Sequence, residues 1–118
     1  MKDKRKTRRR YLLYYMRIYD GDSRQQIGNL VDITPEGAMI LTEDPVEVGK
    51  TLHLRMELTV EVAEKPFMDF TARTIWCEQD VAPHLYNCGL EIQEIQPEDI
   101  KIIRRIIKEF GFRENRLE

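Results

Sequence analysis

The sequence has little of what catalytic and membrane-spanning proteins usually carry. Only two cysteines and two histidines occur among the 118 residues, and no apolar run approaches the roughly 20 residues that span a bilayer. Neither a glycine-rich phosphate loop nor a nucleophile elbow is found. His53 and His84 have no Cys, Asp or Glu partner at a spacing typical of metal or catalytic sites. We therefore predict a protein that is not an enzyme and needs no metal or cofactor.

The few cysteines and the N-terminus also bear on location. Cys77 and Cys88 stand eleven residues apart without a CxxC motif, which predicts two reduced, partly buried thiols. The N-terminus is basic, but residues 11–19 are interrupted by Arg17 and no small-residue cleavage site follows. We expect a cytoplasmic protein without membrane insertion.

What the sequence does contain is typical of one soluble domain. A hydrophobic content of 42% and a charged content of 34% suit a globular chain with a single core. We predict a basic flexible arm at residues 1–10 and a β-barrel domain at residues 11–118.

Charge is distributed very unevenly along the chain. Seven of the first ten residues are Lys or Arg and one is Asp, so this segment carries a charge of +6. The whole chain has 19 basic and 21 acidic residues, which leaves 12 and 20 for the other 108 residues, a charge of −8. A cationic arm on an acidic body suggests an anionic partner. On charge alone, a solvated arm or a non-specific nucleic-acid contact is the more common explanation of such a segment.

Turn residues at short intervals predict an all-β domain. The clearest strand follows residue 51, where apolar and polar residues alternate with a period of two. Runs bounded by turn signals predict six strands, at residues 11–19, 27–33, 38–42, 52–60, 67–77 and 85–93.

The period changes to that of a helix near residue 97. Pro97 suits a first helical position, and the acidic Glu98 and Asp99 favour a helix N-terminus. Apolar residues then recur at helical spacing up to Phe110, before Gly111 as a C-terminal cap. The predicted fold is a mostly all-β, six-stranded antiparallel barrel, whose C-terminal helix at about 97–110 covers an open end or a seam.

Two segments could bind a ligand. Arg5 and Arg9 are four residues apart, with Arg8 and Arg10 adjacent, and guanidinium groups can clamp a phosphate or stack on a purine. The second segment is Asp32-Ile33-Thr34-Pro35-Glu36-Gly37, between two predicted strands.

This second segment offers groups that suit a guanine. Its Asp32 carboxylate could accept from the N1–H and N2–H of the base, and Thr34 offers a hydroxyl. Gly37 permits a close backbone approach or a positive φ. The alternative interpretation is a strand-to-strand turn held by Asx-type hydrogen bonds.

Together, the segments Arg5-Lys6-Thr7-Arg8-Arg9 and Asp32-Ile33-Thr34-Pro35-Glu36-Gly37 resemble the paired motifs of the PilZ family. The resemblance extends to the long strand with Trp76, the Cys88-Gly89-Leu90-Glu91-Ile92 strand and the final helix. In this chain Thr34 takes the place of the family's serine.

The resemblance implies a PilZ-like β-barrel that acts as a bacterial receptor for the second messenger cyclic di-GMP. It implies that Arg5 and Arg9 hold the ligand's phosphates and guanines, and that Asp32, Thr34 and Gly37 receive a guanine. Arg8 and Arg10 remain alternatives because the register of the arm is open.

The partners that this resemblance implies are cyclic di-GMP and an unidentified effector protein. No specific nucleic acid is expected, and a homodimer stays open. Two other functions also stay open, namely a protein adaptor with weak or no nucleotide binding and a small nucleic-acid-binding barrel. Trp76 and the tyrosines at 11, 14, 15 and 19 are interpreted as packing residues of the core or a dimer interface, rather than as base-stacking platforms.

Overall fold

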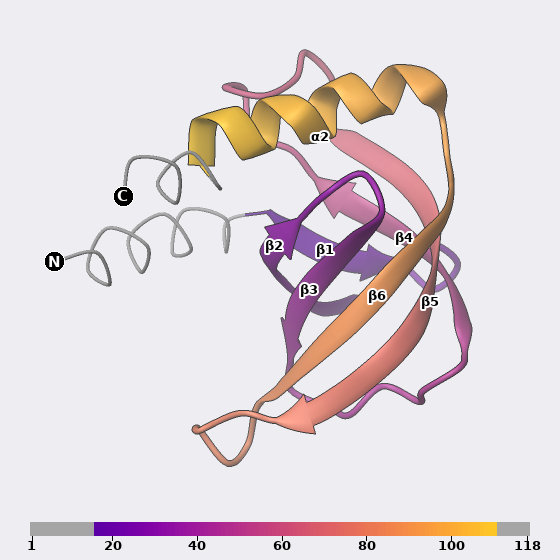
Figure 1. Ribbon diagram of the computed structural model, residues 1–118, viewed down its shortest axis with the longest axis vertical. Helices are drawn as coiled ribbons and strands as arrows, with labels where there is room; N and C mark the ends of the chain where they lie inside the picture. Colours follow the sequence, from indigo (N-terminus) through magenta and orange to yellow (C-terminus); the bar gives the residue numbers. More distant parts are fainter. Residues whose placement is uncertain (1–15, 111–118) are drawn as a thin grey trace, which may run out of the picture.

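The computed structural model describes residues 16–110, which form a closed barrel of six strands followed by one helix (Figure 1). All neighbouring strands are antiparallel, and their order around the barrel is β1-β2-β3-β6-β5-β4. The elements are β1 (Arg17–Asp20), β2 (Gln26–Ile33), β3 (Gly37–Thr42), β4 (Thr51–Glu57), β5 (Phe67–Gln79), β6 (Tyr86–Ile95) and α2 (Pro97–Phe110). The predicted six-stranded antiparallel barrel with a C-terminal helix is confirmed.

The core lies inside the barrel because apolar and polar residues alternate along the strands. Every strand contributes at least one buried apolar side chain to a single cluster, including Ile18, Leu30, Ile40, Leu54, Phe70 and Leu90. Closing the ring leaves no unpaired strand edge, so the outer faces of the strands remain as the binding surfaces.

Helix α2 lies across one end of the barrel (Figure 1). Ile103 and Ile106 are buried in the barrel core, together with Val62 from the β4–β5 loop. The buried carboxylate of Asp99, in the first turn of α2, lies 2.7 Å from Nζ of Lys65 in the same loop. The helix and this loop together close that end of the barrel, as the sequence predicted for the helix.

Several predicted strand limits are wrong. Strand β4 ends at Glu57 instead of reaching Val60, because the chain turns there and Val62 N donates to Thr59 O at 3.1 Å. Val60 is consequently 89% exposed, although it continues the period-two alternation of the apolar residues on the buried face of β4. The alternating pattern continued for three residues beyond the actual strand.

The β5–β6 hairpin is also longer than predicted. Strand β5 runs to Gln79 and β6 from Tyr86 to Ile95. The hairpin loop is held by Asp80 N donating to Leu85 O at 2.8 Å and by Asn87 Nδ2 donating to Asp80 Oδ1 at 2.7 Å. These bonds lie at the end of the β5–β6 ladder, which includes residues 78 and 79 beyond the predicted strand end at residue 77.

The turn residues that follow residue 19 form a hairpin connection between β1 and β2. Asp20 Oδ1 accepts hydrogen bonds from Asp22 N at 2.7 Å and Ser23 N at 3.1 Å, and these bonds hold the pKa of Asp20 below its usual value. The proposed start of the first strand at residue 11 and the cap at Gly111 lie outside the described residues.

Candidate functional site

The segment from Asp32 to Gly37 connects β2 to β3 and places its three predicted site residues in one small region of the barrel surface. Asp32 lies opposite Met39 of β3, next to a bulge that shifts the β2–β3 register between Leu30 and Asp32. Its carboxylate is half-buried, and Oδ1 accepts a hydrogen bond from Ile33 N at 3.0 Å. The bulge leaves Asp32 on the outer face while both Leu30 and Val31 are buried.

The Thr34 hydroxyl holds the turn together. Its oxygen accepts from Glu36 N at 3.2 Å and from Gly37 N at 3.1 Å. The backbone closes the same turn, because Thr34 N donates to Gly37 O at 2.7 Å. Hydrogen bonding within the turn, which the sequence offered as the alternative interpretation, therefore does occur at Thr34 and fixes the backbone that follows Asp32.

Gly37 is required because strands β3 and β6 approach closely there. A Cβ atom added to Gly37 would lie 2.7 Å from Leu90 O, closer than real Cβ contacts allow. Of the two reasons that the sequence suggested for this glycine, close approach is the one that applies. Ile92 N also donates to Glu36 O at 2.8 Å, so the turn is tied to β6.

Trp76 lies on the same outer face, so it is not a core residue, and its alternative role in a dimer interface stays a prediction. A second bulge shifts the β5–β6 register between Thr74 and Trp76, and the Trp76 side chain is 37% exposed. Its indole covers Gly89, the residue opposite it on β6, because a Cβ atom at Gly89 would overlap the ring. The only sign in the sequence that the indole covers a neighbouring strand is the glycine at position 89. This sign can be used only when the β5–β6 register is known.

These residues form a line across four strands of the outer face. Asp32 is opposite Met39, Met39 is opposite Gly89, and Gly89 is opposite Trp76. We call Asp32, Met39, Gly89 and Trp76 the outer-face row. With neighbouring strands about 4.8 Å apart, the row spans about 14 Å between an acceptor carboxylate and an exposed aromatic ring.

The four arginines predicted to hold the ligand lie outside the described residues. They are Arg5, Arg8, Arg9 and Arg10. The described chain begins at Met16, whose carbonyl accepts a hydrogen bond from Leu30 N at 3.1 Å. The point at which the described chain begins is therefore beside the segment of β2 that carries Asp32.

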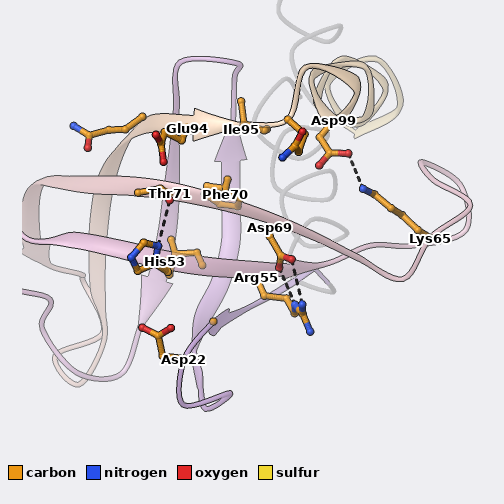
Figure 2. A pocket seen from close by; sticks show the side chains of 14 residues that line it. Asp22, His53, Arg55, Lys65, Asp69, Phe70, Thr71, Glu94, Ile95 and Asp99 are labelled. Atoms are coloured by element: carbon orange, nitrogen blue, oxygen red, sulfur yellow. Dashed lines mark hydrogen bonds and ion pairs between the residues drawn. The ribbon is translucent and has the colours of Figure 1, made fainter.

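A pocket lies on another face, between β4, β5, β6, the β1–β2 turn and the start of α2 (Figure 2). It has a volume of about 1000 Å³. Its charged groups are largely paired with one another: Arg55 binds Asp69 through two hydrogen bonds of 2.8 and 3.1 Å, and Lys65 pairs with Asp99. His53 Nδ1 lies 3.3 Å from Thr71 Oγ1. Because these groups satisfy each other, we place the candidate site at the outer-face row instead.

The described residues contain no group of three or more His, Cys, Asp or Glu side chains placed to hold a metal ion. Within residues 16–110 no helix has the length and apolar character that crossing a membrane requires.

Solved structures of similar fold include those of two proteins described below. The first is the inhibitor of motility MotI/DgrA of Bacillus subtilis, with a TM-score of 0.63 and 16% identity. The match covers 79% of this chain and 45% of that one, so this chain spans less than half the length of the motility inhibitor.

The second is the PilZ domain of YcgR from Escherichia coli, whose structure was solved with c-di-GMP. Its TM-score is 0.58 and its identity 13%, with 83% of both chains covered. At these identities the two likenesses establish a shared fold.

No curated protein matches the sequence. Residues 3–109, which comprise nearly the whole chain, match the PilZ domain family. The match includes the N-terminal arginines, the Asp32–Gly37 segment and the final helix, and the barrel is that of the solved PilZ domain. The chain belongs to the PilZ domain family.

Proposed function

We propose that the protein is a non-enzymatic receptor for cyclic di-GMP that relays the presence of this nucleotide to a protein partner. The observation that carries the proposal is the outer-face row, which places the Asp32 carboxylate and the exposed Trp76 ring on one surface. Membership of the PilZ family supports it, as does the nucleotide bound to the related domain of YcgR.

The chemistry of the row matches the two halves of a guanine dinucleotide. The Asp32 carboxylate can accept from the parallel N1–H and N2–H donors of one guanine, a charge-assisted pair. The exposed indole of Trp76 offers a flat apolar surface on which the second base stacks. Thr34 acts through the turn that it holds, and Gly37 through the close packing of β3 on β6.

The phosphates require cations, which the arm supplies. Arg5 and Arg9 close over the two phosphates from the side on which the chain enters β1, with Arg8 and Arg10 adjacent to them. Arg73 of β5 lies opposite Glu91, which in turn lies opposite Gly37, so an additional cation stands on the same outer face. Ordering of the arm on the ligand would be the signal that a cytoplasmic partner reads.

Isothermal titration of the full chain with cyclic di-GMP tests this function. Asp32→Ala removes hydrogen bonds to a charged acceptor, so we expect an affinity about 10- to 100-fold lower than that of the unchanged chain. The matched control is Asp44→Ala, an exposed aspartate of the β3–β4 loop, which should bind as the unchanged chain does.

The result also separates the other functions. A folded barrel that gives no heat at tens of micromolar nucleotide would leave the protein an adaptor and rule out the receptor. Binding of single-stranded nucleic acid that weakens steeply with salt and survives Asp32→Ala would instead indicate a nucleic-acid-binding barrel. A Trp76→Ala variant that binds as tightly as the unchanged chain would exclude stacking on the indole.

A further inference from the structure

The two cysteines lie directly opposite each other on adjacent strands. Cys77 of β5 is paired with Cys88 of β6, and their Sγ atoms are 2.9 Å apart. Opposed residues of antiparallel strands have Cα atoms about 4.5–5.5 Å apart, inside the roughly 4.4–6.8 Å that disulfides span. Forming an S–S bond of about 2.0 Å therefore needs a movement of less than about 1 Å, without any change of backbone register.

The surroundings of the two thiols differ. Cys88 is fully buried in the core, whereas Cys77 is half-buried and packs at the edge of the core. Val46 N donates a hydrogen bond to Cys77 Sγ at 3.4 Å. Burial, together with the contact with Cys77, raises the pKa of Cys88 to about 11. Cys77 is thus the thiol that a small oxidant reaches first.

We propose that Cys77 and Cys88 are a redox-active dithiol that hydrogen peroxide converts into a reversible intramolecular disulfide. The site is distinct from the nucleotide-binding function proposed above and does not depend on it. Both cysteines are free thiols in the structure described, which corresponds to the reduced form.

The reaction balances with the peroxide as the only added reagent. The Cys77 thiolate attacks one peroxide oxygen, the O–O bond breaks, and the second oxygen leaves as water after taking up a proton. The Cys88 sulfur then attacks the sulfenic acid at Cys77, the S–O bond breaks, and the Cys88 proton leaves with the hydroxide as a second water. Two thiols are oxidised by two electrons and one peroxide is reduced. A dithiol reductant reverses the reaction by exchange.

The disulfide would link strands β5 and β6 next to the outer-face row. Trp76 immediately precedes Cys77 in β5, and Gly89 immediately follows Cys88 in β6. The bond would therefore form on the inner face of the same two strands whose outer face carries the stacked indole and glycine. Since Trp76 is the only tryptophan in the chain, its fluorescence reports on this position alone.

Treatment of the full chain with hydrogen peroxide, followed by alkylation in denaturant and peptide mapping, tests the proposal. We expect the two alkylatable thiols per chain to be lost together. They should appear as one linked peptide pair joining Cys77 to Cys88, lighter by two hydrogen atoms. Dithiothreitol should restore both thiols. The proposal is overturned if both cysteines remain alkylatable, if each is oxidised separately to an acid, or if the bond joins two chains.

Fluorescence of Trp76 provides a second measurement. A disulfide quenches a neighbouring indole, so peroxide should lower the emission of the unchanged chain and dithiothreitol should restore it. Cys77→Ser and Cys88→Ala, checked for folding by circular dichroism, are the matched controls and should show no reversible change. An equal reversible change in the variants would contradict the proposal.

Discussion

Two buried threonines illustrate how the partners of a single hydroxyl decide its contribution to stability. Thr42 and Thr74 are both almost completely buried, on β3 and β5. Thr42 Oγ1 donates to Asp44 O at 2.7 Å, whereas the Thr74 hydroxyl has no hydrogen-bond partner among residues 16–110. A buried hydroxyl without a partner has lost its water and gained nothing in return.

Replacing each hydroxyl by a methyl group should therefore have opposite effects. We expect Thr74→Val to raise the free energy of unfolding by about 1 kcal/mol and Thr42→Val to lower it by about 1 kcal/mol. Urea unfolding followed by circular dichroism measures both values. A Thr74→Val variant less stable than the unchanged chain would show that the hydroxyl does have a partner.

Single residues also show how the contacts in the fold define the role of a candidate side chain, as for Thr34 and Trp76. The sequence offered the Thr34 segment either as a ligand site or as a hydrogen-bonded turn, and the structure shows the Thr34 hydroxyl accepting hydrogen bonds within the turn. It presented Trp76 as a packing residue of the core or of a dimer interface, and the partial exposure of the ring on the outer face excludes the core. In both cases the residue type was read correctly, and its neighbours decided what the side chain does.

At the scale of elements, one ion pair joins α2 to the β4–β5 loop. Asp99 is buried, and its partner Lys65 is about half exposed. The carboxylate lies in the first turn of the helix, where the helix dipole also favours a negative charge. Removing Lys65 would leave a buried charge without its ion-pair partner, which costs more than removing a surface charge.

We therefore expect Lys65→Met to lower the free energy of unfolding by about 1–2 kcal/mol, less than a fully buried pair would cost because Lys65 is partly solvated. Adding Asp99→Asn should recover part of this loss. Chemical denaturation of the single and double variants measures the effect.

The control is Lys101→Met, on an exposed position of α2, which should stay within about 0.5 kcal/mol of the unchanged chain. A loss at Lys101 equal to that at Lys65 would mean that the ion pair does not secure the helix.

On the scale of the whole molecule, the barrel is closed by residues 17–95 and capped by α2. Every strand has two hydrogen-bonded neighbours in this ring, so the described fold needs no strand from residues 1–10. We therefore propose that residues 1–10 serve as the ligand-binding arm of the proposed function.

Deleting residues 1–10 should shift the unfolding temperature by less than about 2 °C, since all six strands of the closed barrel lie within residues 17–95. The same deletion should abolish the heat of cyclic di-GMP binding, because both Arg5 and Arg9 are lost. Thermal unfolding of the truncated chain tests the prediction on stability, and titration with cyclic di-GMP tests the prediction on binding. A large drop in unfolding temperature would contradict the assignment of residues 1–10 as an arm.

Local sequence determined most of the architecture and one part of the site. Period-two alternation, turn residues and the change to helical spacing at Pro97 predicted six antiparallel strands and the final helix. The turn after Asp32 is held by hydrogen bonds between residues two or three positions apart, so the spacing of its residues could be recognised in the sequence. These features depend on residues a few positions apart, which is why they can be read without a partner strand.

Tertiary structure alone decided which distant residues meet. The bulges in β2 and β5 set the register that places Asp32, Met39, Gly89 and Trp76 in one row, and that brings Cys77 opposite Cys88. A bulge arises from the balance of packing and hydrogen bonds between two strands, and neither strand encodes it alone. For this reason the sequence could supply the candidate residues, while only the folded barrel could bring them together.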